Sequence, residues 1–315
     1  MAVVLDPSQW WRVDLVLQQL INGITIGAIY AIVALGYTMV YGIIRLINFA
    51  HGAVFMYGAY VGLTVLDLLG GSSPLFGTAT DLCLAFLVSI AFCAGLGWAM
   101  DSLVYRQLRV RRAHPLIPLI AALGISLVLE ISAMLIWGKE FKVYPQVFPT
   151  WHLSFGRVVI SGTQFVLLFV CVALMVALHL FVQKTTIGKA MRAAALDHTA
   201  ARLVGVDVDK VIRLTFILGS ALAAVAGILV GLYYGAVNFR MGYVPGLKAF
   251  TAAVLGGVGN IPGAMVGGFI IGILETFGAA YISGEWKDAI AFVILITVIV
   301  VKPTGLLGER IAERT

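Results

Sequence analysis

Long runs without a formal charge alternate with short polar segments along the whole chain. The runs at residues 15–44, 158–183 and 214–239 contain no Asp, Glu, Lys or Arg. A helix needs about 20 apolar residues to cross the hydrocarbon core of a bilayer. Each run is long enough to do so, and the pattern predicts transmembrane helices. Shorter runs that we expect to be further spans lie at residues 51–66, 82–100, 116–137 and 289–301.

One apolar stretch, residues 245–276, is interrupted by a cluster of helix-breaking residues: Gly256, Gly257, Gly259 and Pro262–Gly263. In a helix interior Gly costs about 1 kcal/mol and Pro about 3 kcal/mol. Two shorter helices that meet at a break are therefore expected here. Inside a membrane such a break is tolerated where the backbone is buried in protein or lines a cavity.

The composition agrees with this pattern. Hydrophobic residues make up 61% of the chain and charged residues 11%, with a mean hydropathy of +1.02. These values are typical of a polytopic membrane protein and exclude a soluble domain. We predict an all-α fold with about eight transmembrane helices plus a short broken membrane helix. Residues 1–315 are expected to form a single transmembrane domain.

The net charge of +6 is explained by the distribution of basic residues among the loops, without any nucleic-acid partner. Four arginines lie in residues 101–115 and six Lys or Arg residues lie in residues 183–213. Lys and Arg near span ends resist translocation, so both segments are expected in the cytoplasm. Counting spans from them predicts an outer N-terminus and an inner C-terminus. We expect no cleavable signal peptide.

Residues 183–213 also have an internal order that a plain connector does not need. Residues 189–195 are rich in Ala and predict a short helix, and Asp197 can cap a second one by accepting amide hydrogen bonds. Gly205 can end that helix in a left-handed conformation, and Asp207 can cap the next span. These short helices and turns would form a projection into the cytoplasm that contacts a partner protein. The alternative is a solvated loop. The apolar face of the projection would comprise Ala200, Ala201, Leu203 and Val204.

Several polar or irregular positions inside the spans are candidates for a translocation path. Polar side chains within a membrane need partners and often mark such a path. The alternatives are a turn hydrogen-bonded to its neighbours and, for the glycines, helix packing alone. The candidates are Asn22, Asn48, His51, Gly256, Gly257, Gly259 and Glu275.

No catalytic or metal-binding motif is present in the sequence. The five histidines are scattered without HExxH spacing, and no GxxxxGK[ST] phosphate loop occurs, so the chain cannot hydrolyse ATP alone. Cys83, Cys93 and Cys171 lie inside apolar runs without metal-ligand spacing. We expect no enzyme activity, no bound cofactor and no metal.

Three long motifs resemble one transporter family. They are INGITIGAIYAIVALGYTMVYGIIRLINFAHG from residue 21, IGKAMRAAALDHTAARLVGVDVDKVIRLTFILGSALAAVAG from residue 187, and KAFTAAVLGGVGNIPGAMVGGFIIGILE from residue 248. Together with the closing PTGLLG, they are similar to the permeases of branched-chain amino acid ABC importers. The resemblance is closest to the H-type member of the paired H and M permeases, and it covers residues 17–308.

This resemblance implies that the chain is one subunit of a multi-subunit importer in the bacterial inner membrane. A second, M-type permease subunit would complete the path, two cytoplasmic ATPases would bind ATP and Mg²⁺, and a periplasmic binding protein would deliver substrate. The resemblance also implies that residues 188–205 couple the permease to an ATPase. The expected coupling residues are Gly188, Arg192, Asp197, Ala200, Ala201, Leu203 and Gly205.

Three other functions are alternatives to a permease for branched-chain amino acids. A permease of the same family could carry urea, short amides or other amino acids. An ion-coupled secondary transporter needs ionisable groups along its path, and only Glu130 and Glu275 lie well inside apolar runs. An intramembrane enzyme lacks support, since no Ser or Cys has a plausible base nearby.

Overall fold

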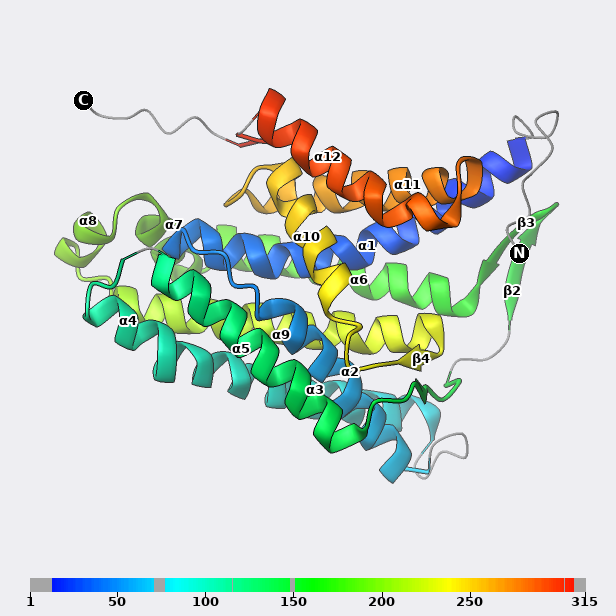
Figure 1. Cartoon of the computed structure of the whole chain (residues 1–315), viewed down its shortest axis with the longest axis horizontal. Coiled ribbons are helices and arrows are strands. Elements are labelled where there is room, and N and C mark those ends of the chain that lie inside the picture. The colour runs from blue at the N-terminus through cyan, green and yellow to red at the C-terminus, as the bar shows by residue number, and fades with distance from the viewer. Residues whose placement is uncertain (1–12, 71–76, 115, 148–150, 303, 309–315) are drawn as a thin grey trace.

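In a computed structural model of the protein, the described residues are 13–70, 77–114, 116–147, 151–302 and 304–308. They form an elongated bundle in which most long helices run roughly along the long axis (Figure 1). The short helices α7 and α8 lie at one end, and two short two-stranded β-sheets, one of them a hairpin, lie at the other. We call these the α7–α8 end and the hairpin end.

Six helical segments of the described chain are long and apolar enough to cross a membrane. The polytopic α-helical class is therefore confirmed, whereas a count of about eight spans is not. The six are Val13–Ile44 (α1), Ala79–Val110, Leu116–Trp137 (α5), Gly162–Lys184 (α6), Val208–Tyr234 (α9) and Ile261–Tyr281 (α11). Three further bundle helices miss these criteria in length or apolar character: His51–Leu68 (α2), Tyr243–Gly256 (α10) and Lys287–Val301 (α12).

The predicted polar loop at residues 101–115 is wrong over most of its length. The helix α3 (Thr78–Met100) continues through a π-helical turn, η2 (Asp101–Tyr105), into α4 (Arg106–Val110). The extension is stabilised because Arg109 Nη1 reaches Asp101 Oδ1 at 2.8 Å, which pairs its charge across two turns.

The predicted span at residues 158–183 is wrong in its first four residues. They form β3 (Val158–Ser161), which pairs antiparallel with β2 (His152–Phe155). A second two-stranded sheet pairs β1 (Lys142–Val143) antiparallel with β4 (Ala236–Val237), which lies far away in the sequence. Helix α6 begins only at Gly162, because Ser161 and Gln164 form a capping box there.

The centre of the bundle is built on α1, which is buried along most of its length against α9 and α11. Small residues allow this close approach. A Cβ on Gly27 would lie 2.8 Å from the Cα of Phe269, so α1 and α11 meet backbone to backbone. Likewise a Cβ on Gly58 of α2 would lie 2.8 Å from the carbonyl oxygen of Ala224 on α9.

Two helices, α2 and α10, begin near the middle of the bundle. Residues 45–50 run back from the α7–α8 end before α2 starts, and residues 235–242 run back from the hairpin end before α10 starts (Figure 1). The two starts touch: a Cβ on Gly52 would lie 3.4 Å from the Cα of Gly246. These two starts inside the bundle, one in each half of the chain, differ from the break predicted at residues 256–263, which lies between α10 and α11.

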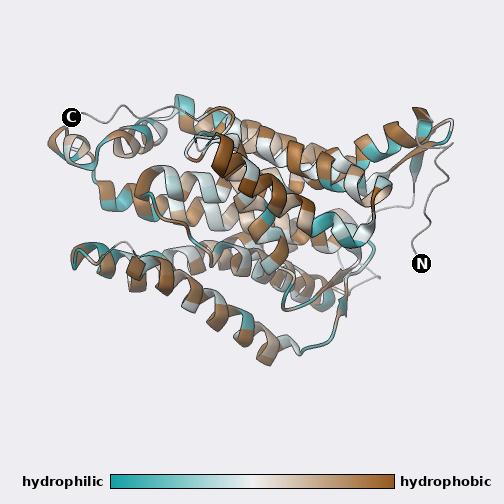
Figure 2. Ribbon diagram, turned by 45° about the horizontal axis from the view of Figure 1, so that its top comes forward, coloured by the Kyte–Doolittle hydropathy of each residue, from teal (hydrophilic) through white to brown (hydrophobic). Residues whose placement is uncertain are grey.

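The outer helices are rich in hydrophobic residues, which Figure 2 colours brown. Much of α5 is exposed on this chain, although its sequence is apolar. A contiguous apolar surface of this kind marks a lipid-facing or subunit-facing side. The exposed large side chains of α5 include Leu116, Ile120, Leu127, Val128, Ile131 and Leu135.

Candidate functional site

The segment at residues 183–213 contains the two short helices α7 (Thr186–Leu196) and α8 (His198–Leu203). Asp197 lies between them, and its Oδ1 accepts hydrogen bonds from the amides of Thr199 at 2.6 Å and Ala200 at 3.1 Å. Asp207 caps α9, accepting from the Lys210 amide at 3.1 Å. Both predicted caps are confirmed.

These amide hydrogen bonds also change the acidity of the caps. The amides of Ala200 and Thr199 lower the pKa of Asp197, and the Lys210 amide lowers the pKa of Asp207. A folded-state pKa below the unfolded value of about 4 stabilises the folded form above that pH. The contribution is lost as the pH falls through the folded pKa. Both carboxylates therefore cap their helices at neutral pH.

Two of the expected coupling residues, Gly188 and Arg192, fix α7 to the end of α6. The Gly188 amide donates to Thr185 Oγ1 at 3.0 Å, and its Cα lies so close to the carbonyls of Phe181 and Val182 that a Cβ would not fit. The Arg192 guanidinium donates to the Val182 carbonyl. Both residues therefore contact their own chain and set the direction in which α7 leaves the membrane helix.

Three more of the expected coupling residues, Ala200, Ala201 and Leu203, lie on α8 and divide between its two faces. Ala201 is buried against the chain, whereas Ala200 is exposed. Leu203 and the preceding Leu196 are both 84% exposed. Val204 is 77% exposed, and we call these three exposed apolar residues, Leu196, Leu203 and Val204, the apolar tip. The chain turns directly after it at Gly205, whose φ is +86°, as the predicted glycine stop requires.

The apolar tip is tied to the bundle by His198, the first residue of α8. Its Nε2 lies 2.7 Å from the carbonyl oxygen of Ile43 at the end of α1. Because the carbonyl can only accept, Nε2 carries the proton in this contact. Through this contact, a movement of α8 would be passed to the end of α1, the most buried of the long helices.

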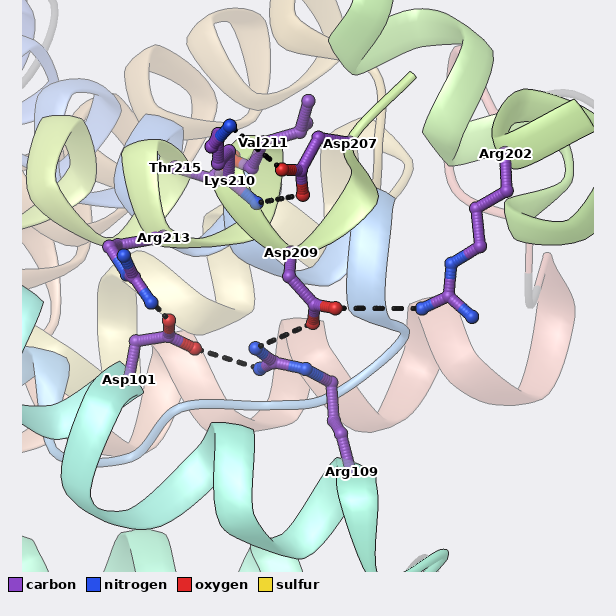
Figure 3. A network of polar contacts seen from close by, with 9 residues as sticks. All are labelled: Asp101, Arg109, Arg202, Asp207, Asp209, Lys210, Val211, Arg213 and Thr215. Carbon is purple, nitrogen blue, oxygen red and sulfur yellow. Dashed lines mark hydrogen bonds and ion pairs between the residues drawn. The ribbon is translucent and has the colours of Figure 1, made fainter. Parts of the chain in front are cut away.

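A network of ion pairs joins the two basic segments (Figure 3). Asp101, whose side chain is fully buried, lies between Arg109 at 2.8 Å and Arg213 at 3.7 Å. Arg109 also contacts Asp209 at 3.5 Å, and Asp209 reaches Arg202 on α8 at 3.7 Å. The two segments predicted to be cytoplasmic therefore lie at the same end. Asp209 connects α8 to α4 through these two ion pairs.

Asn48 and His51 are buried at the start of α2. Asn48 Oδ1 accepts from the Ala50 amide at 3.2 Å and from the Tyr105 hydroxyl at 3.0 Å. The His51 ring packs edge-on against Tyr37, with the centroids 4.8 Å apart. The two side chains thus hold the re-entering segment in place, as a turn bonded to its neighbours would.

Gly256, Gly257 and Gly259 form the predicted break, since α10 ends at Gly256 and α11 begins at Ile261. Gly257 and Gly259 have φ values of +107° and +93°. The break lies at the α7–α8 end, where Gly259 lines one small cavity together with Arg192. It is a turn between two packed helices and not an interruption at the middle of the bundle.

Glu275 belongs to a buried cluster contributed by four helices. Its Oε1 lies 2.7 Å from Lys248 Nζ, and its Oε2 accepts from the Tyr30 hydroxyl at 2.8 Å. Lys248 also pairs with Asp288 at 2.6 Å. Glu275 is therefore neutralised by a partner, and the cluster joins α10 to α1, α11 and α12.

Asn22 lies apart from the other candidates, near the hairpin end. Its Oδ1 accepts from Gln18 at 3.2 Å and from Gln164 at 3.0 Å, which connects α1 with α6. The candidate path residues are consequently distributed over separate places in the bundle, and they do not gather in one site.

Comparisons with known proteins identify the family of this chain. Residues 19–299 match the family described as branched-chain amino acid transport system / permease component. The chain belongs to this family. It is 44% identical to the high-affinity branched-chain amino acid transport permease protein BraD of Pseudomonas aeruginosa and 43% identical to LivH of Escherichia coli K12. Each alignment covers 95% of this chain and 97% of the relative.

A more distant relative is the probable branched-chain amino acid transport permease protein LivH of Methanocaldococcus jannaschii. It is 31% identical over 88% of both chains. No solved structure shows a significant match to this chain. Membership of the permease family, together with six membrane-length helices, makes the chain a multi-pass membrane protein.

Three charged residues that were not among the predicted site residues, Asp101, Lys248 and Asp288, form ion pairs in this structure. Asp101 was read as a loop residue, and Lys248 and Asp288 were not singled out. A lone Lys within an apolar stretch that also ends in a Glu is itself a signal, because buried charges in membranes are retained only when paired. That signal predicts the Lys248–Glu275 pair, although not the third partner.

Proposed function

We propose that this chain is an integral membrane permease subunit of an ABC importer for branched-chain amino acids. The observation that carries the proposal is the full-length similarity to permeases named for high-affinity branched-chain amino acid transport. In this proposal the chain works in a bacterial inner membrane and binds no cofactor. ATP and Mg²⁺ would be bound by separate ATPase subunits.

The geometry of residues 183–213 supports docking on such an ATPase. The apolar tip is exposed, while the caps, the ion-pair network and His198 hold it in one position. A rigidly supported apolar surface suits a contact that must transmit movement in both directions. Residues 183–213 are therefore proposed as the coupling loop, with one ATPase on this subunit and a second on an M-type permease partner.

A periplasmic binding protein would dock at the opposite, hairpin end. The proposed path then runs between the two permease subunits, from the hairpin end to the α7–α8 end. Asn48 and His51 would hold the irregular start of α2 that borders this path, and they need not touch the substrate.

Reconstitution tests the proposal directly. Proteoliposomes that contain both permease subunits and both ATPases should accumulate labelled leucine when ATP and the liganded binding protein are supplied. This chain alone should show neither ATP hydrolysis nor uptake. Concentrative uptake by this chain alone, or uptake driven by an ion gradient without ATP, would contradict the proposal.

Competition assays distinguish this substrate class from the others that the family could carry. Unlabelled isoleucine and valine should reduce leucine uptake by the complete importer, whereas urea and short amides should not. Uptake of labelled urea by the same vesicles would assign the chain to the alternative substrate class.

A further inference from the structure

A cavity between α2, α5 and the start of α10 is lined by Glu130, and the ion-pair partner of this residue, Arg240, lies between two further lining residues in the sequence, Phe239 and Gly242. It is a small cavity that opens to the outside of this chain. Most of its wall is apolar or aromatic. The side chains that matter here are Tyr37, Phe49, Met56, Leu123, Leu247 and the single acid Glu130.

Glu130 is the only formal charge in α5, and it lies well inside that helix. Its Oε1 is 3.6 Å from Nε of Arg240, a residue of the segment that re-enters the bundle before α10. Arg240 is positioned from both sides: its amide donates to Asn238 Oδ1 at 2.9 Å, and its guanidinium lies 5.3 Å from the ring centroid of Phe239.

The place of this pair in the bundle is unfavourable for lipid contact. Gly242, two residues after Arg240, touches Gly52 at the start of α2, near the middle of the long axis. Even so, the Arg240 side chain is 76% exposed on this chain. An exposed guanidinium at such a depth has to face water or another polar group, because hydrocarbon would not solvate it. The side of the bundle on which Arg240 is exposed, next to the cavity, therefore faces a polar path and not the bilayer.

The ends of two helices reinforce the same polarity. The first turns of α2 and α10 both line the cavity, through Gly52 and Ala53 and through Tyr243 and Gly246. The N-terminal end of a helix carries a partial positive charge that favours anions. Half-helices that meet inside a membrane protein are suited to holding an anionic group of a substrate.

We propose that this cavity is the point at which a free α-amino acid contacts this subunit on its way through the membrane. Arg240 receives the α-carboxylate, Glu130 receives the α-ammonium group, and the apolar wall receives an aliphatic side chain. The inference rests on the proposed function. The Glu130–Arg240 ion pair is exchanged for two ion pairs with the zwitterion, so the charge balance is kept in both states.

The test uses the complete importer in proteoliposomes, with leucine uptake and ATP hydrolysis measured in parallel. Glu130→Gln and Arg240→Gln should each lower leucine uptake by about tenfold or more, because each leaves one charged end of the substrate unpaired. Stimulation of the ATPase by the liganded binding protein should persist, since neither residue lies at the α7–α8 end. The number of ATP molecules hydrolysed per leucine should therefore rise, which loss of folding would not produce.

Two further variants distinguish substrate recognition in the cavity from the general effect of removing an ion pair. Ser126→Trp fills the cavity without changing any charge and should also reduce uptake. Arg157→Gln removes an ion pair of similar length, 3.7 Å to Asp14, at the hairpin end and outside the cavity. Its uptake and its ratio of ATP to leucine should equal those of the wild type.

The outcomes distinguish this site from the function it rests on. Wild-type vesicles that fail to accumulate leucine would overturn the proposed function, and this site with it. Wild-type uptake that is unchanged in Glu130→Gln, Arg240→Gln and Ser126→Trp would overturn the site alone. A parallel loss of uptake and of stimulated ATP hydrolysis would also overturn it, because that pattern indicates a structural ion pair.

Discussion

Leu203 is the residue on which the coupling proposal depends most directly. Its side chain is 84% exposed at the end of α8, and an ATPase groove would bury it. Leu203→Glu should then place an unpaired charge in that contact, at a cost of several kcal/mol. We expect normal membrane abundance, loss of ATPase co-purification and loss of uptake.

Leu203→Met is the matched control, because it keeps an apolar side chain of similar volume and should retain both co-purification and uptake. Since Leu203 touches little of its own chain, neither change should alter insertion. Wild-type uptake by Leu203→Glu at normal abundance would show that residues 183–213 are only a solvated connector.

Gly205 permits a test that depends on backbone conformation alone. Its φ is +86°, and a Cβ at this position would meet no atom within 4 Å. A β-branched residue is therefore disfavoured by its backbone and not by a clash, at about 1–2 kcal/mol. Gly205→Val should weaken ATPase co-purification, whereas Gly205→Asn, which tolerates this conformation better, should weaken it less. Equal retention in both variants would exclude a need for this turn.

Local signals at single residues were readable from the sequence, and distant pairings were not. Asp197, Asp207 and Gly205 act on amides or dihedral angles within three residues, so the sequence predicted their roles. Asp101 and Arg213 are more than a hundred positions apart, and nothing local relates them. The apolar face of α8 was predicted as a unit, but Ala201 turns towards the chain while Leu203 turns away.

Among the elements, the junction of η2 and α4 with α9 has the clearest energetic consequence. Asp101 is fully buried and balances Arg109 and Arg213. Asp101→Asn leaves Arg213 without its acid, and breaking a buried ion pair costs about 3–5 kcal/mol. Because both arginines keep some contact with solvent, we expect the lower part of that range. Thermal unfolding of the purified protein in detergent should show a clear fall in Tm.

Asp207→Asn is the matched control for that measurement. Asp207 pairs with Lys210 at 3.1 Å on the surface, and such exposed pairs contribute about 0–1 kcal/mol. Asn also caps a helix about as well as Asp. Its Tm should therefore stay close to the wild-type value. Equal shifts for Asp101→Asn and Asp207→Asn would mean that the network carries no more stability than a surface contact.

The helices themselves were predictable where hydrophobic length alone decides them. Residues 15–44 became α1 with small changes at its start, and the break after Gly256 was located correctly. Hydrophobicity did not distinguish a β-strand from a helix at residues 158–161, since Val and Ile suit both in an apolar run. Nor did it show that α2 and α10 begin inside the bundle, because that depends on contacts between segments far apart in sequence.

The molecule as a whole has two chemically different ends. The α7–α8 end holds both basic segments, the buried Asp101 and the exposed apolar tip. The hairpin end holds the two short sheets and the polar contacts of Asn22. Between them, Lys248 pairs with Glu275 and Asp288, while the Glu130–Arg240 pair has one partner, Arg240, that is largely exposed. This distribution leaves the cavity beside α5 as the place where a polar substrate can contact charged side chains, those of Glu130 and Arg240.

The same asymmetry predicts how the chain lies in the membrane. Helix α1 starts at the hairpin end, where Gln18 donates to the Val159 carbonyl at 3.1 Å. Residues 304–308 pack on the break at the other end, with the Leu307 amide 3.0 Å from the Gly256 carbonyl oxygen. Because basic segments stay in the cytoplasm, the N-terminal side should face outward and the C-terminal side inward.

Reporter fusions check this orientation. A reporter that is active only in the cytoplasm should work when fused to the C-terminus, and one that is active only in the periplasm should work when inserted at residue 140, between α5 and β1. Insertions after Gly205 should give the cytoplasmic signal, because that residue lies beside the basic network. A C-terminal reporter active only in the periplasm would reverse the assignment of both ends. The apolar tip would then be presented to the periplasm, where no ATPase could meet it.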